Sequence, residues 1–255
     1  MTVNDLYRYL DSKIPQSLSM DWDNDGLMCA PNPAKEVKRV LIALDVTSSV
    51  VSYAVAHRYD VIVSHHPMVF HDLKHLDGNR LQEAKLMQCV KEDISVMSFH
   101  TRLDVLTGGV NDVLAKRLGL KDTVPFESEG VLIGRIGYLP KAMPLDTFAK
   151  TVKDALGCPV VSLADAGKEV KKVALVGGEG SDCLEDALKA GADTYVSGEL
   201  KYHHLVDAPE MGINCVVAGH YYTETGVCAF LKDLIGSFCS GLEIDVLESN
   251  EIRVV

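Results

Sequence analysis

The feature that most constrains the fold is an alternation of strand-like and helix-like segments that occurs twice along the 255-residue chain. Three apolar runs in the first half have the length of buried strands, and they lie at 39–46, 60–64 and 94–99. Segments with helical periodicity follow them, at 48–59, 79–93 and 108–120. Such alternation is typical of mostly parallel sheets flanked by helices, so an α/β fold is predicted.

The second half repeats this order. Its strand-like runs lie at 171–178, 192–197 and 213–219, and its helix-like segments at 181–191, 199–212 and 225–238. Ser64 follows Val40 by 24 residues, and Ser197 follows Val173 by the same interval, with a strand, a helix and a strand in each case. The repeat predicts two similar α/β lobes, each with a mostly parallel sheet, whose strand ends converge.

The segment between the two halves predicts a further strand or two and a helix, and we place the boundary near Val124. We expect residues 1–124, completed by 225–255, to form the first lobe, and residues 125–224 the second. The last residues, 242–255, have the pattern of one or two strands.

Composition and charge exclude several classes of protein. The formal net charge of −11 disfavours generic nucleic-acid binding, because an acidic chain repels phosphate backbones. The seven cysteines are odd in number and form no C-x-x-C pair, which disfavours a disulfide framework or zinc ribbon. The N-terminus has helical periodicity without the features of a signal peptide, and no apolar run approaches the roughly 18 residues of a membrane helix. We expect a soluble cytoplasmic protein without a membrane partner.

Two adjacent histidines, His65 and His66, follow the apolar run 60–64. They lie at the carboxyl end of a predicted parallel strand, where ligands of α/β proteins bind. Neighbouring side chains of a strand point to opposite faces, so both rings reach one site only if the chain leaves strand geometry. Pro67 favours such a turn. Taken alone, the pair is better explained by one packed and one solvated histidine.

Comparable residues follow other predicted strands. His100 and Asp104 come after the third strand of the first half, and His220 and Glu224 occupy the equivalent place in the second half. Each carboxylate, taken singly, is also explained as a helix cap or first-turn residue. His65, His66 and His220, with Asp104 and Glu224, make three imidazoles and two carboxylates, which are too many for one open catalytic metal with about three protein ligands and a water. They suit two metals that share a carboxylate, and Zn, Mn, Fe, Co and Ni all accept such donors.

These motifs give the chain a family resemblance. The stretches that carry it are WDNDGLM (22–28), LIALDVTSSVV (41–51), VIVSHHPMVF (61–70), HTRLDVLTGGVNDVLAKRLGL (100–120), VSGELKYHHL (196–205) and AGHYYTETGV (218–227). With them the chain resembles the dinuclear metal centre proteins often named GTP cyclohydrolase 1 type 2 homologues. The resemblance implies a metal site between two lobes that holds two divalent ions per subunit. The ligands that it implies are His65, His66, Asp104, His220 and Glu224, with Glu224 as the bridge.

The resemblance also implies a ring-shaped, toroidal homohexamer and the short form of the family, which lacks an inserted domain. One position departs from the family pattern: Asp25 stands where a small apolar residue is common. This leaves the implied metal ligands untouched and puts substrate contacts of that loop in doubt.

Five other residues are weaker candidates. His100 and Glu199 are catalytic candidates: His100 is either a proton shuttle or a structural histidine, and Glu199 either faces the site or starts a helix. Asp45 either orients a ligand or caps the next helix. His203 and His204 are expected at the surface or at the rim of a substrate site.

The expected function is a dinuclear metal-dependent hydrolase that acts on a small, nucleotide-like substrate with a metal-activated hydroxide as nucleophile. The family name suggests opening of the imidazole ring of GTP with release of formate. One alternative is a two-metal phosphoesterase. The other is a non-catalytic, metal-binding ring scaffold that engages a protein or nucleic-acid partner.

Overall fold

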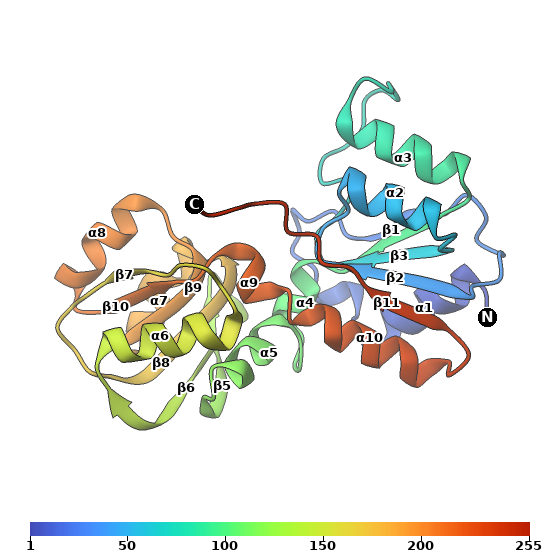
Figure 1. Ribbon diagram of the computed structural model, residues 1–255. Helices are drawn as coiled ribbons and strands as arrows, with labels where there is room; N and C mark the ends of the chain where they lie inside the picture. The colour runs from blue at the N-terminus through green and yellow to red at the C-terminus, as the bar shows by residue number, and fades with distance from the viewer. The chain divides into compact units, whose positions relative to one another are not determined.

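The computed structural model describes residues 1–255 and divides into two compact units. Unit 1 consists of Met1–Leu106 and Val227–Glu251, and unit 2 of Thr107–Gly226 and Ile252–Val255. Each unit contains a multi-stranded sheet with helices packed on it, which confirms the predicted α/β class with two lobes (Figure 1).

The chain passes from unit 1 to unit 2 after Leu106 and not near the predicted boundary at Val124. The reason is that helix α5 (Val110–Arg117) packs against the sheet of unit 2. Its Leu114 belongs to the apolar core of that unit. The last four residues, 252–255, are likewise grouped with unit 2, although we had assigned them to the first lobe.

The sheet of unit 1 has five strands, and four of them are parallel. Their order is β1 (Gly26–Cys29), β4 (Ser95–Ser98), β3 (Val61–Ser64), β2 (Arg39–Ala43) and β11 (Glu243–Val246), with β1 antiparallel to β4. The C-terminal strand β11 thus returns to the first sheet. All four residues of β3 are buried, since both of its faces are covered, and this explains the uninterrupted apolar run in the sequence.

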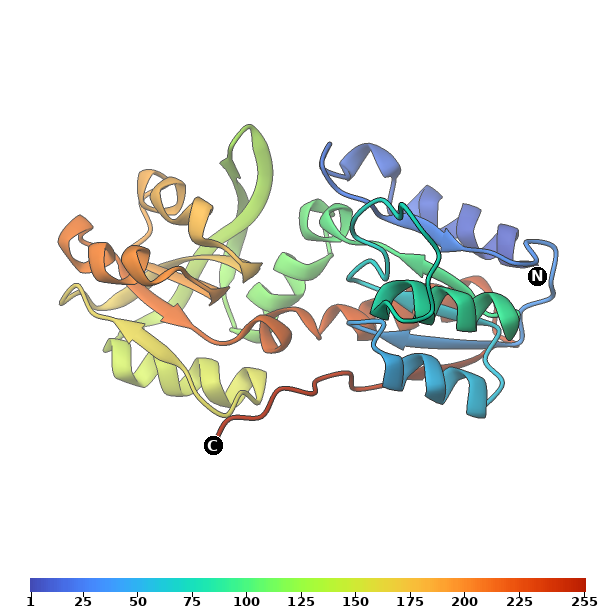
Figure 2. The same ribbon diagram turned by 90° about the horizontal axis from the view of Figure 1, so that it is seen from above.

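Helices cover both faces of this sheet (Figures 1 and 2). They are α1 (Val3–Lys13), α2 (Ser48–Ala56), α3 (Leu81–Lys91), α4 (Thr101–Val105) and α10 (Val227–Phe238), with a 3-10 turn η1 at Gln16–Leu18. Thr47 caps α2 by accepting a hydrogen bond from the N–H of Val50. The apolar faces of α2 and α3 pack on the strands through residues such as Val50 and Cys89.

The sheet of unit 2 is mixed, which differs from the mostly parallel sheet that we predicted. Its six strands are β5 (Lys121–Ser128), β6 (Val131–Met143), β8 (Val170–Glu179), β9 (Thr194–Glu199), β10 (Asn214–Val217) and β7 (Ser162–Ala164), in that order. Only β8, β9 and β10 run parallel. Strands β5 and β6 form a hairpin whose two turn residues, Glu129 and Gly130, both have positive φ, and such a short connection requires antiparallel strands.

Two apolar cores lie on the two faces of this sheet. Helices α5 and α6 (Leu145–Leu156) cover one face, where Val173 and Leu175 point. Helices α7 (Leu184–Lys189) and α8 (Tyr202–Met211) cover the other face, where Ala174 and Val176 point. The remaining elements are η2 (Ser181–Cys183) and the short helix α9 (His220–Glu224).

The predicted repeat is visible in the structure. Val40 of β2 pairs with Val61 of β3, and Val173 of β8 pairs with Thr194 of β9. In each unit a third parallel strand, β4 or β10, is followed within three residues by a five-residue helix, α4 or α9. Both pairs of histidine and carboxylate lie at this strand-to-helix junction.

The seven cysteines are free thiols, and five of them are buried. They therefore act as small packing residues. None of the helices has both the length and the apolar character required to cross a membrane.

Candidate metal centre

The histidine pair lies where the chain leaves β3. The Ser64 hydroxyl donates a hydrogen bond to the His66 carbonyl at 2.8 Å, and the His66 N–H donates to the Leu44 carbonyl at 2.9 Å. This turn places the rings of His65 and His66 on the same side, with their centroids 4.8 Å apart. The departure from strand geometry that a shared site requires is therefore present.

Each of these two rings is held through Nδ1. His65 Nδ1 lies 3.0 Å from the Phe99 carbonyl, and His66 Nδ1 lies 2.7 Å from Oδ1 of Asp45. Both partners only accept hydrogen bonds, so Nδ1 carries the proton and Nε2 presents its lone pair. Metal-binding histidines are commonly fixed in this way by a carbonyl or carboxylate. Asp45 orients His66, and Thr47 is the cap of α2.

His100 is fixed by the same device. Its Nδ1 lies 2.9 Å from Oδ1 of Asp23, whose other oxygen accepts hydrogen bonds from the N–H and hydroxyl of Thr101. Burial by itself would raise the pKa of Asp23, but the hydrogen bonds from His100 and Thr101 outweigh it and lower the pKa to about 2. The carboxylate is therefore charged at neutral pH and holds the proton of His100 on Nδ1.

Three imidazoles of unit 1 converge. Ring nitrogens of His65, His66 and His100 all lie within 4.8 Å of one another, and Oδ1 of Asp104 lies 3.7 Å from Nε2 of His65. Neutral imidazoles beside a carboxylate form a donor set that suits Zn, Mn, Fe, Co or Ni. The group fits a divalent transition metal. His100, which the sequence suggested as a proton shuttle or structural residue, belongs to this cluster.

Unit 2 brings together a second group of predicted residues. His220 and Glu224 lie one turn apart on α9, with Nε2 of His220 3.1 Å from Oε2 of Glu224. Nδ1 of His220 lies 3.5 Å from Oε1 of Glu199, which ends β9. Glu199 therefore faces His220. Glu224 is buried, and burial of a carboxylate requires compensating charge or hydrogen bonds.

Glycines of the neighbouring strands make room for α9. A Cβ at Gly178, whose φ is +66°, would lie 2.2 Å from Oε1 of Glu224. The N–H of Gly178 donates to the hydroxyl of Thr223 at 3.1 Å. A Cβ at Gly198 would collide with the Thr223 hydroxyl and with the backbone of His220. These contacts fix the position of the carboxylate relative to β8 and β9.

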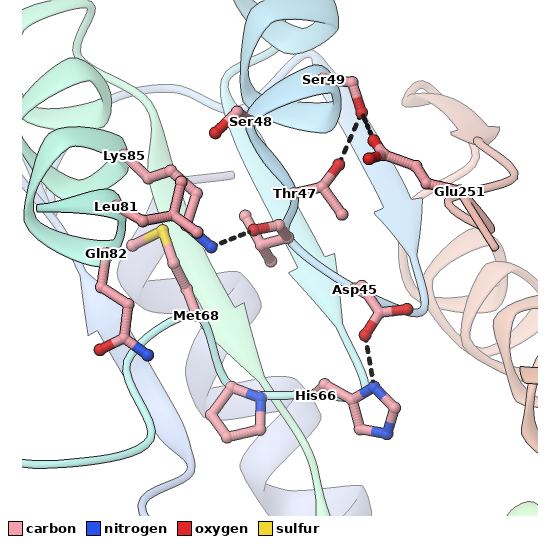
Figure 3. Close-up of a pocket in the computed structure, with 12 residues that line it drawn as sticks. Asp45, Thr47, Ser48, Ser49, His66, Met68, Leu81, Gln82, Lys85 and Glu251 are labelled. Carbon is pink, nitrogen blue, oxygen red and sulfur yellow. Dashed lines mark hydrogen bonds and ion pairs between the residues drawn. The ribbon is translucent and has the colours of Figure 1, made fainter. Parts of the chain in front are cut away.

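A cavity of about 530 Å³ lies beside His66 in unit 1 (Figure 3). Asp45 and His66 form one side of it, and the first turn of α2 and the first turn of α3 form others. Lys85 reaches into it from α3 and donates to the Val46 carbonyl at 2.6 Å. Burial lowers the pKa of Lys85. The volume lies in the range of small-molecule sites, and the lining offers hydroxyls, carboxylates and an amine.

The remaining candidates lie elsewhere. His203 and His204 lie in the first turn of α8, His203 exposed and His204 half-buried. Asp25 forms a buried ion pair with Arg102, at 2.8 Å from its Nε. Asp23, Arg102 and Lys85 were not predicted as site residues. Asp23 and Arg102 stand in two of the stretches that carry the family resemblance, but their partners are distant in the chain.

The fold and this site define a class: a two-unit α/β protein with a histidine-rich group able to hold a transition metal. Comparison with known proteins gives the family, because the model of the DUF34/NIF3 (NGG1p interacting factor 3) family matches residues 1–253. The chain belongs to the DUF34/NIF3 family.

Named relatives and solved structures agree with this assignment. A protein of Clostridium perfringens named GTP cyclohydrolase 1 type 2 homolog is 34% identical over 230 residues, covering 88% of this chain and 87% of its own length. A NIF3 homolog of Schizosaccharomyces pombe is 31% identical, covering 90% and 86%. The crystal structure of a hypothetical protein of Staphylococcus aureus has a TM-score of 0.89 at 27% identity and covers 100% and 99% of the two chains. Reduced HcgD from Methanocaldococcus jannaschii has a TM-score of 0.84 at 29% identity and covers 97% and 98%.

Proposed function

We propose that this protein is a metal-dependent hydrolase for a nucleotide-like substrate. The observation that carries the proposal is the convergence of His65, His66 and His100, each of which is fixed in orientation by a hydrogen bond at Nδ1. In this arrangement Nε2 of His65 and of His66 suits a metal, and Nε2 of His100 suits proton transfer. The relatives named GTP cyclohydrolase 1 type 2 homolog support the substrate class.

The ligand set that we propose has contributions from both units. By the family resemblance, the residues that would hold two divalent ions are His65, His66 and Asp104 of unit 1 and His220 and Glu224 of unit 2. The family resemblance and the chemistry of the donors support this set. Two such ions lower the pKa of a water and stabilise negative charge that develops on an electrophilic carbon or phosphorus.

The chain's own residues would perform the remaining steps. With its proton held on Nδ1 by Asp23, His100 presents Nε2 as the acceptor for a proton from the attacking water and returns it to the leaving group. Asp45 keeps His66 oriented. In the adjacent cavity, Lys85 supplies a positive charge for an anionic part of the substrate.

The direct test is release of formate from GTP by protein loaded with Zn, Mn, Fe, Co or Ni in turn. Replacement of His65 by alanine should abolish turnover and reduce bound metal, measured by elemental analysis. His57→Ala is the matched control, because His57 is exposed and its ring stacks on Tyr53. Equal rates for the wild type and His65→Ala would exclude this site as the source of activity.

A phosphoesterase is the second candidate, and Lys85 in the cavity beside His66 is the observation that favours it. Phosphomonoesters and phosphodiesters should therefore be assayed beside GTP. Metal binding without turnover of any of them would instead support the non-catalytic scaffold. The ring-shaped homohexamer also stays a prediction, which sedimentation velocity would test.

A further inference from the structure

The only tryptophan of the chain, Trp22, is 64% exposed. It lies in the loop between η1 and β1, in unit 1. Large aromatic rings are usually buried, because each removes a large apolar area from water on folding. A ring that stays exposed on a mobile loop needs no explanation, so the question is whether this loop is fixed.

Hydrogen bonds fix the loop on both sides of Trp22. The N–H of Met20 donates to the Thr101 hydroxyl at 3.0 Å. The carboxylate of Asp23 accepts from His100 and Thr101, and the amide of Asn24 donates to the Val69 carbonyl at 2.7 Å. The indole is therefore presented to solvent by a backbone that is bound before and after it.

Two other rings surround the indole without covering its faces. Phe70 lies 6.2 Å away with its plane at 59° to the indole, and His100 lies 6.3 Å away at 76°. Phe70 and His100 are themselves 6.1 Å apart and nearly perpendicular. The indole face is thus available for stacking at a corner whose third ring, His100, belongs to the candidate metal centre.

The surroundings of Trp22 favour a small planar ligand over a protein surface. Its sequence neighbour Asp21 is exposed and charged, and the ring contacts of Trp22 are with Phe70 and His100 only, so the open apolar face is that of the indole itself. Protein interfaces need a much larger contiguous area. A planar heteroaromatic ring has apolar faces and polar edges, and it matches one open indole face with hydrogen-bonding groups around it.

We infer that Trp22, supported by Phe70, is a stacking subsite for a planar heteroaromatic ring of the nucleobase class, held beside His100. This inference rests on the proposed function, since it names the part of the substrate that the metal centre would act on. The subsite also gives a reason for the fixed loop. Trp22 would contact one face of the bound heteroaromatic ring, while the histidine cluster would lie at the edge of that ring.

Because Trp22 is the only tryptophan, its fluorescence reports this position alone. Guanosine and GTP should quench the emission saturably, whereas ribose 5-phosphate and inorganic triphosphate should not. The quenching should persist after metal removal by chelation, and it should exceed that of free N-acetyltryptophanamide at equal ligand concentration. Absence of saturable quenching would overturn the inference. So would an emission spectrum that changes with protein concentration alone, because another copy of the chain would then cover the ring.

Variants test the same point by equilibrium dialysis of guanosine. Trp22→Phe keeps an aromatic face and should bind within a few-fold of the wild type, while Trp22→Leu should bind about tenfold or more weakly. Phe238→Leu is the matched control, since this partly exposed ring of unit 1 stacks on Tyr9. Equal affinities for Trp22→Leu and the wild type would refute the subsite.

Failure of this inference is distinguishable from failure of the proposed function. Guanosine binding that depends on Trp22, without any turnover, would refute the proposed hydrolase activity and support the stacking subsite. GTP turnover that is unchanged in Trp22→Leu would refute the stacking subsite and support the proposed hydrolase activity.

Discussion

Asp45 holds His66 through a 2.7 Å hydrogen bond to Nδ1, and this contact should set how well the ring binds a metal. Asp45→Ala is expected to weaken metal affinity about 10- to 100-fold, as for other residues that orient a metal-binding histidine. Competition with a chromophoric chelator for Zn or Mn measures this change. Asp245→Ala is the control, because its carboxylate accepts from Tyr59 at 2.6 Å, away from the histidines. An unchanged affinity in Asp45→Ala would contradict the orienting role.

The buried ion pair of Arg102 and Asp25 makes a prediction about stability. Both side chains are fully buried, and the two are joined by hydrogen bonds of 2.8 and 3.0 Å. Asp25→Ala leaves the guanidinium without this partner in the interior, so the free energy of unfolding should fall by about 3 kcal/mol or more. Urea unfolding measures it.

The control for this pair is an exposed one. Glu36 lies 3.3 Å from Lys38, and both side chains are largely in solvent. Glu36→Ala should change the free energy of unfolding by less than about 1 kcal/mol, because exposed ion pairs contribute little. Similar losses in Glu36→Ala and Asp25→Ala would show that burial does not determine the contribution of the Arg102 pair.

These residues also show how far sequence reasoning reaches. The position of His65 and His66 at the end of a strand was predictable because they directly follow a buried apolar run, which is a local pattern. The roles of Asp23 and Arg102 depend on partners up to 91 residues away in the chain. No local pattern indicates such a pairing, and the same residues would look like ordinary surface charges.

At the scale of elements, the contact between β8 and α9 leaves no room for an added side chain. Gly178→Ala would add a Cβ 2.2 Å from Oε1 of Glu224, at a residue whose φ is +66°. Either the carboxylate or the strand must move, so the variant should lose both stability and metal affinity. Thermal unfolding and chelator competition measure the two losses.

Gly157 provides a control that distinguishes the steric effect of the Gly178 contact from the effect of backbone strain. Its φ is +70°, as a left-handed residue at the end of α6, but a Cβ there would meet no atom within 4 Å. Gly157→Ala should therefore cost only the strain of the left-handed conformation, about 1–2 kcal/mol, and leave metal affinity unchanged. Equal effects of the two alanine variants on metal affinity would disprove the role of the Gly178 contact.

Strands and helices differ in how well the sequence predicted them. Strands such as β3 were predictable because burial on both faces gives an uninterrupted apolar run. Strand β5 is mostly exposed and contains Pro125, so its pattern is weak. Helix α5 was recognisable from its periodicity, but periodicity does not say which sheet a helix covers. The predicted boundary near Val124 therefore came too late in the chain.

At the scale of the whole molecule, the two units differ in how the chain builds them. Nearly all of unit 2 comes from one continuous segment, 107–226, whereas unit 1 needs both 1–106 and 227–251. The later segment supplies β11, which pairs with β2, and α10, which buries Leu231 and Ile235. Without it, β2 becomes an open edge and one face of the sheet loses part of its cover.

A fragment of residues 107–226 is therefore expected to fold alone, and a fragment of residues 1–106 is not. Joining 1–106 to 227–251 through a short flexible linker should restore cooperative unfolding, because β11 and α10 again complete the sheet and its core. Near-ultraviolet circular dichroism and urea unfolding of the three polypeptides measure this. If 1–106 alone unfolds with the same midpoint and steepness as the fusion, the C-terminal segment contributes nothing to the first sheet, and the discontinuous unit is not a folding unit.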